Sequence, residues 1–132
     1  MRRYTGALLG LALLAGCATV GPLERRLEGR WQWVESTGGL AGLRRTPQSE
    51  GYNQELVFYS HKLEVWRSGK LVTVLRYRIE RKRTLLQPEP GDVLVYEDLF
   101  LPEQLIRWGR GDTLYLADVC ADCFVHTYVR RR

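Results

Sequence analysis

The stretch Gln54–Glu80 reads QELVFYSHKLEVWRSGKLVTVLRYRIE and contains the clearest structural pattern in this 132-residue chain. Its first half holds two short runs rich in aromatic and β-branched residues, at 54–60 and 62–67, which predict a β-hairpin. The dipeptide Ser68-Gly69 that follows is typical of a tight turn between antiparallel strands. The chain therefore turns back on itself at least twice within this stretch.

The second half of the stretch, residues 70–80, is the strongest predicted strand. Its side chains alternate, so that successive residues point to opposite faces of a sheet. One face holds Leu71, Thr73, Leu75, Tyr77 and Ile79, and the other holds Arg76, Arg78 and Glu80. This alternation predicts a sheet with one face against a core and one face in water.

Short strands with close turns are predicted along the rest of the chain as well. They are expected at 29–36, 83–87, 92–98, 104–108, 112–117 and 124–130, with Pro or Gly between them. Helical patterns are limited to a short amphipathic turn at 23–29 and a possible one at 99–105. This pattern predicts an all-β fold, either a sandwich or an antiparallel up-and-down barrel of roughly eight strands. Closure into a barrel is favoured because it removes exposed strand edges.

The first residues of the chain predict a targeting segment rather than a part of the fold. Arg2 and Arg3 precede a short apolar stretch that ends in Leu14-Ala15-Gly16-Cys17, which resembles the lipobox of bacterial lipoproteins. We expect a signal peptide at 1–16, a lipidated tether at 17–26 and a barrel domain at 27–132. The alternative is an uncleaved anchor over 4–23, although its glycines and proline make a poor membrane helix.

A lipid on Cys17 has consequences for partners and for charge. Removal of Arg2 and Arg3 lowers the formal net charge from +5 to +3. No Asp follows Cys17, so the outer membrane of the cell envelope is the expected location. A protein anchored there meets little nucleic acid, so its basic residues favour a solvated face or contact with anionic headgroups over a nucleic-acid partner.

Cys120 and Cys123 form a C-x-x-C motif in a predicted loop between two strands. A redox pair needs a helix N-terminus, which the pattern does not predict here. A metal site could use both cysteines with Asp118 and His126, but structural zinc normally needs two paired motifs. A disulfide that closes a hairpin loop in an exported protein is the favoured interpretation, with no metal.

Two segments of the predicted barrel resemble the lipocalin family. Gly29-Arg30-Trp31 matches the Gly-x-Trp that opens the first lipocalin strand, and the ending Gly111–Leu116 followed by Thr127–Arg130 is similar to small bacterial lipocalin-like proteins. The second lipocalin motif, Thr-Asp-Tyr, is absent. The resemblance implies an eight-stranded barrel in which Arg130 stacks on Trp31 and closes one end. It also implies that segment 37–51 covers the other, open end.

Two classes of function follow from such a barrel. A possible ligand cavity would be lined by large apolar side chains, namely Trp33, Phe58, Leu75, Tyr77, Leu114, Leu116 and Phe124. It would hold a small hydrophobic ligand. Alternatively, the interior is a packed core, and the protein is a structural or interaction module of the envelope. Only His61 and His126 are available for acid–base chemistry, and no known catalytic motif occurs, so neither an enzyme nor a cofactor is expected.

Overall fold

The computed structural model describes residues 21–132. The predicted signal peptide and Cys17 lie outside these residues. The described chain begins with the short helix α1 (Pro22–Leu27), which has a proline at its first turn and Glu28 as its C-cap, in the region where the pattern at 23–29 predicts a helical turn. Among residues 21–132, no helix has the length and apolar character needed to cross a bilayer.

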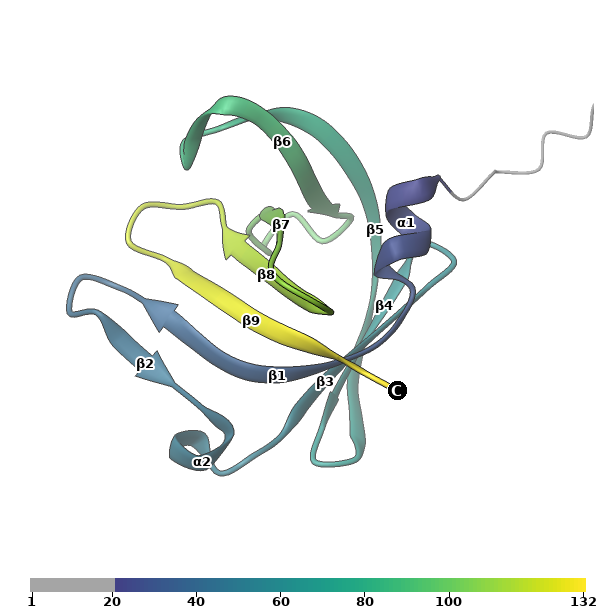
Figure 1. Ribbon diagram of the computed structural model, residues 1–132, viewed down its shortest axis with the longest axis vertical. Helices are drawn as coiled ribbons and strands as arrows, with labels where there is room; N and C mark the ends of the chain where they lie inside the picture. The colour runs from purple at the N-terminus through teal and green to yellow at the C-terminus, as the bar shows by residue number, and fades with distance from the viewer. Residues whose placement is uncertain (1–20) are drawn as a thin grey trace, which may run out of the picture.

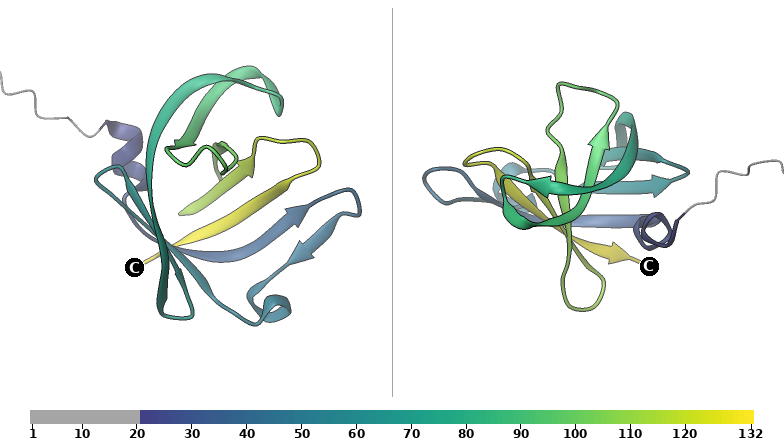
Figure 2. Two further views of the ribbon diagram at one scale, coloured as in Figure 1. Left: turned by 180° about the vertical axis from the view of Figure 1, so that it is seen from behind. Right: turned by 90° about the horizontal axis from the view of Figure 1, so that it is seen from above.

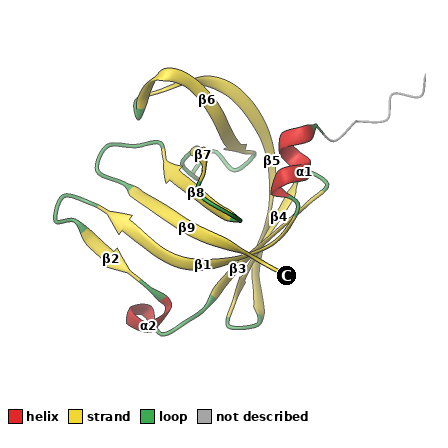
Figure 3. Cartoon of the chain, in the orientation of Figure 1, coloured by secondary structure: helices red, strands yellow, loops and turns green. Residues whose placement is uncertain are grey.

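The strands form a closed antiparallel barrel. β1 pairs with β3 on one side and with β9 on the other, which closes a ring of eight strands and leaves β2 outside it (Figures 1 and 3). This confirms the predicted all-β up-and-down barrel. The strands are β1 (Gly29–Gly38), β2 (Leu43–Arg45), β3 (Gln54–Tyr59), β4 (Lys62–Arg67), β5 (Lys70–Thr84), β6 (Gln87–Tyr96), β7 (Gln104–Trp108), β8 (Thr113–Asp118) and β9 (Phe124–Arg131).

The separate strand expected at 83–87 does not form. β5 and β6 instead make one long hairpin that arches along one side of the barrel, with its turn at Leu85-Leu86 (Figure 2). The error came from treating Pro88 and Pro90 as breaks. The register shifts in this region, between Lys82 and Thr84, so the prolines lie where the ladder needs no N–H donor.

The helical turn expected at 99–105 is also wrong. A loop with a turn closed from Leu101 N–H to the Asp98 carbonyl occupies its first half, and β7 begins at Gln104. Gln104 and Leu105 pair with Asp118 and Ala117 on β8, so sheet pairing overrides the local preference.

Segment 37–51 contains more regular structure than the sequence predicts. β2 pairs back onto the end of β1, and the short helix α2 (Pro47–Glu50) follows. Thr46 caps α2, because its hydroxyl accepts the Ser49 N–H while the Ser49 hydroxyl accepts the Thr46 N–H. Thr-Pro is a helix-start signal that the sequence interpretation did not use.

One end of the barrel, here called the closed end, is sealed by α1 and the last strand. Leu27 is fully buried there, and its carbonyl accepts the indole N–H of Trp31 at 2.7 Å. The guanidinium of Arg130 lies 4.3 Å from the centre of the Trp31 ring and donates to the carbonyls of Glu28 and Arg26, both at 2.6 Å. This is the contact that the lipocalin resemblance implies.

The opposite end, here called the open end, is surrounded by four connections. These are the β1–β3 connection with β2 and α2, the β4–β5 turn, the β6–β7 loop and the β8–β9 loop. Gly38 lets β1 pass close to β9 there, because a Cβ on Gly38, with its φ of +151°, would collide with the backbone of Cys123 and Phe124. The candidate site lies at this end.

Candidate ligand-binding site

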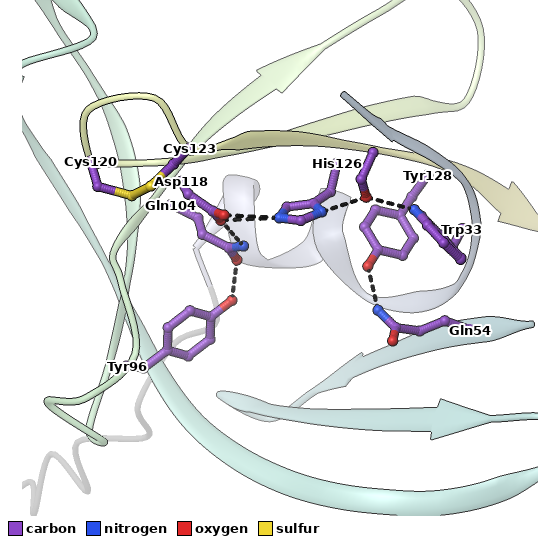
Figure 4. A network of polar contacts seen from close by, with 10 residues as sticks. Trp33, Gln54, Tyr96, Gln104, Asp118, Cys120, Cys123, His126 and Tyr128 are labelled. Atoms are coloured by element: carbon purple, nitrogen blue, oxygen red, sulfur yellow. Dashed lines mark hydrogen bonds and ion pairs between the residues drawn. A yellow bond between two sulfur atoms is a disulfide. The ribbon is translucent and has the colours of Figure 1, made fainter. Parts of the chain in front are cut away.

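A chain of hydrogen bonds crosses the open end of the barrel from β1 to β9 and β8 (Figure 4). The Trp33 indole N–H donates to Ser36 Oγ at 2.9 Å, and Ser36 Oγ lies 2.6 Å from His126 Nδ1. His126 Nε2 lies 3.0 Å from a carboxylate oxygen of Asp118. An ionised carboxylate only accepts, so Nε2 is the donor to Asp118. In the Nε2–H tautomer, Nδ1 accepts from the Ser36 hydroxyl.

The chain continues to β7 and β6. Gln104 donates from Nε2 to Asp118 at 2.8 Å, and its Oε1 accepts the hydroxyl of Tyr96 at 2.5 Å. Burial alone would raise the pKa of Asp118, but the hydrogen bonds from His126 and Gln104 lower it below its usual 3.8. Burial raises the pKa of Tyr96 far above 10, so this hydroxyl remains a proton donor.

A second chain of hydrogen bonds runs along the β3 side. Gln54 donates from Nε2 to the Tyr128 hydroxyl at 2.8 Å, and its Oε1 accepts from Arg67 Nε at 2.9 Å. Every buried side-chain polar atom in residues 21–132 has a hydrogen-bond partner. The polar groups at this end are therefore held in fixed positions before any ligand arrives.

An apolar cavity of about 170 Å³ lies beside these two chains. Its wall is mostly aliphatic and aromatic, and it also includes the amides of Gln54 and Gln104 and the imidazole of His126. The lining residues are Gln54, Leu56, Leu63, Val65, Leu75, Tyr96, Leu101, Pro102, Gln104, Leu116, His126 and Tyr128. We call it the apolar cavity.

A second cavity, also of about 170 Å³, adjoins the first and shares Gln54 and His126 with it. Two guanidinium groups lie at its border, with Arg45 stacked 4.7 Å above the Phe124 ring and Arg67 stacked 4.7 Å above the Tyr52 ring. The lining residues are Trp33, Ser36, Arg45, Tyr52, Gln54, Arg67, Phe124 and His126. We call it the cationic cavity.

The predicted cavity residues divide into three groups. Leu75 and Leu116 line the apolar cavity, and Trp33 and Phe124 line the cationic cavity. The other three, Phe58, Tyr77 and Leu114, are buried in the main core and line neither cavity. The interior is thus packed in its closed half and hollow at its open end.

Of the polar residues of the site, the sequence predicted Asp118 and His126 only as candidate metal ligands, and it did not predict Gln54, Gln104 or Ser36. Gln54 begins a strand whose inward positions continue with Leu56 and Phe58, and Gln104 similarly precedes Ile106 and Trp108. A polar side chain in phase with the inward face of a strand is a signal for a polar wall. Ser36 gives no such signal, because the register of β1 against β9 shifts between Trp33 and Glu35.

Cys120 and Cys123 form a disulfide that closes the β8–β9 loop, with a Cα–Cα distance of 5.6 Å. This confirms the predicted pairing and leaves neither thiolate free to bind a metal. Among residues 21–132, no group of three or more His, Cys, Asp and Glu side chains is arranged to hold a metal ion. The disulfide lies between Asp118 and His126 in the chain and so fixes the loop that connects them.

Ser36, His126 and Asp118 are hydrogen bonded in the order found in nucleophilic triads. However, Ser36 is only 5% exposed, and its Oγ already accepts the Trp33 N–H. In this environment Ser36 and Asp118 hold His126 in a fixed orientation, and His126 lines both cavities.

Comparison with known proteins adds no family to these observations. No family model, curated protein or solved structure matches the chain.

Proposed function

We propose that this chain is a lipocalin-like binding protein that holds a small hydrophobic ligand at the open end of its barrel. The observation that supports the proposal is the apolar cavity, which lies inside a barrel whose other end is sealed. A dry cavity of about 150 Å³ is large enough to bind benzene. The volume here therefore suits one aromatic ring or a short aliphatic chain, and not a long fatty acid.

The wall of the cavity supports a binding role because its polar groups are already satisfied. A ligand that enters only needs to displace water from apolar surface, since Gln54, Gln104 and Tyr96 keep their partners within the protein. Ligand pockets commonly combine an apolar lining with a few fixed polar groups. A barrel that serves only as a structural module needs no such preformed space.

The proposal is tested with a substitution that fills the cavity. Leu75→Trp places a larger side chain in the apolar cavity, whereas Leu85→Trp adds the same side chain in the exposed β5–β6 turn. We expect benzyl alcohol to cause saturable amide chemical-shift changes in the wild type and in Leu85→Trp, and none in Leu75→Trp. Saturable binding that is unchanged in Leu75→Trp would overturn the proposal, as would no binding of any single-ring probe to the wild type.

We further propose that the barrel is anchored to the bacterial outer membrane by lipid on Cys17. The support is the Leu14–Cys17 motif after a basic start and an apolar stretch. In cells that process lipoproteins, we expect an alkyne fatty acid to label the wild-type chain and not Cys17→Ser. Mass spectrometry should find Cys17 as the first residue. An unlabelled chain that retains residues 1–16 would contradict the anchor.

A second candidate function is hydrolysis of a small ester held in the same cavities. The order Ser36–His126–Asp118 favours it, while the buried serine hydroxyl opposes it. Turnover of 4-nitrophenyl acetate distinguishes hydrolysis from simple binding. Hydrolysis requires a rate that falls at least about 100-fold in Ser36→Ala. The binding proposal expects equal background rates in both proteins.

A further inference from the structure

We infer that the ligand carries an anionic group, a carboxylate or a group of similar geometry, which binds at Arg67 while its apolar part fills the apolar cavity. This inference rests on the proposed binding function and adds the chemical class of the ligand. It follows from the position of Arg67, from its lack of an acidic partner and from the connection between the two cavities.

Arg67 is the cation placed to meet a ligand. Within residues 21–132 it forms no ion pair, whereas Arg45, on the same cavity, is paired with Glu50 at 3.4 Å. Its guanidinium lies over the Tyr52 ring and donates its Nε–H to Gln54 Oε1. The terminal nitrogens keep donors for a planar anion, and the stacked, hydrogen-bonded side chain is already oriented.

Gln54 links this cation to the apolar cavity. It lines both cavities, and its Oε1 accepts from Arg67 while its Nε2 donates to Tyr128 on the apolar side. The side chain of Gln54 is therefore all that separates Arg67 from a ligand ring in the apolar cavity. A short linker between ring and anionic group is enough to span that separation.

The carboxylates beside this site already have partners, and Glu50 is paired with Arg45. Asp118 lines neither cavity, and both of its oxygens are occupied by His126 and Gln104. The aromatic rings of Trp33, Tyr52 and Phe124 also line the cationic cavity, together with Ser36 and His126.

The test compares acids with alcohols of the same shape. The probes are benzoate, phenylacetate and 3-phenylpropionate, each paired with benzyl alcohol, 2-phenylethanol or 3-phenylpropanol, and affinity is measured by amide chemical shifts at low salt. We expect at least one acid to bind the wild type about tenfold more tightly than its alcohol. Raising the salt concentration should reduce this preference.

Matched variants locate the preference. Arg67→Gln removes the inferred anion contact, and Lys70→Gln removes the same charge from the exposed residue that pairs with Arg67 across the β4–β5 turn. We expect Arg67→Gln to bind acid and alcohol alike, Lys70→Gln to keep the wild-type ratio, and Arg67→Lys to restore part of it. The quantity compared is the ratio of acid to alcohol affinity within each variant, and saturable alcohol binding in each of them shows that it is folded.

The outcomes separate the inference from the proposed function. If neither acids nor alcohols bind, the proposed function is wrong and the inference falls with it. If both series bind equally to the wild type, or if Arg67→Gln keeps the preference for acids, only the inference is wrong.

Discussion

At the scale of single residues, Arg130 shows how one side chain can close a barrel. Its two terminal nitrogens donate to the carbonyls of Glu28 and Arg26, and its plane covers the Trp31 ring. These contacts join the last strand to the residues just before the first strand. Arg131 and Arg132, its neighbours, instead pair with acidic groups at the surface.

Arg130→Met should therefore destabilise the fold far more than Arg132→Met. The first substitution leaves two carbonyl groups without donors and removes a cation–π contact, a loss of about 2–4 kcal/mol. The second removes one exposed ion pair, a loss of at most about 1 kcal/mol. Urea unfolding measures both values, and equal losses would show that Arg130 does not close the barrel.

Asp118 should make the free energy of unfolding depend on pH. The pKa of its carboxyl is lowered in the folded protein, so its contribution is fully present above the unfolded value of about 3.9 and disappears as the pH falls through the lower folded value. Asp118→Asn should be less stable than the wild type by about 2 kcal/mol at pH 7.

The difference between the two proteins should shrink below about pH 4, as the wild-type carboxyl becomes protonated. Thermal unfolding of both proteins between pH 7 and pH 2.5 measures this difference. A gap that stays constant over the whole range would mean that the ionised state of Asp118 does not contribute to the network.

At the scale of elements, the close pairing of β1 with β9 depends on Gly38. Gly38→Ala should cost about 3 kcal/mol or more, because the new Cβ meets the backbone of Cys123 and Phe124 as well as an unfavourable φ. Gly42→Ala is the control, since Gly42 also has a positive φ, of +62°, but faces open space. Urea unfolding should show at most about 1–2 kcal/mol for the control. A similar loss in both variants would mean that backbone strain alone explains the effect.

The disulfide of the β8–β9 loop should contribute modestly to global stability. A loop this short restricts the unfolded chain by only about 2 kcal/mol. In Cys120→Ser/Cys123→Ser we expect that loss, together with faster amide exchange in residues 118–126 and unchanged exchange at the closed end. Hydrogen exchange measures both regions, and uniform acceleration would show that the loop does not open locally.

Elements with strict alternation could be predicted from sequence, and those set by long-range pairing could not. Residues 70–80 form part of a strand as expected, and Leu75, Tyr77 and Ile79 pack in the core. Leu71 and Thr73, which the alternation places on the same face, are exposed. The β5–β6 hairpin and the start of β7 depend on partners far along the chain, which local patterns do not contain. The contact between Ser36 and His126 could not be predicted for the same reason, because the two residues meet only through the pairing of β1 with β9.

At the scale of the whole molecule, the barrel has a packed closed end and a hollow open end, and the proposed function assigns binding to the open end. The closed end is filled by Trp31, Leu27 and the Arg130 contacts, while the open end keeps its cavities within a fixed hydrogen-bond network. The proposed ligand would thus enter without disturbing the core. The proposed anchor at Cys17 precedes α1, so it would place the closed end nearer the membrane and leave the open end accessible.

The position of a bound ring tests the account most directly. With 3-phenylpropionate at saturation, we expect intermolecular nuclear Overhauser effects from the ring protons to the methyl groups of Leu75 and Leu116, and none to Leu27 or Leu94 in the core. Contacts only to residues on the outer surface of the barrel, or no intermolecular contacts at saturating probe, would contradict a binding site at the open end.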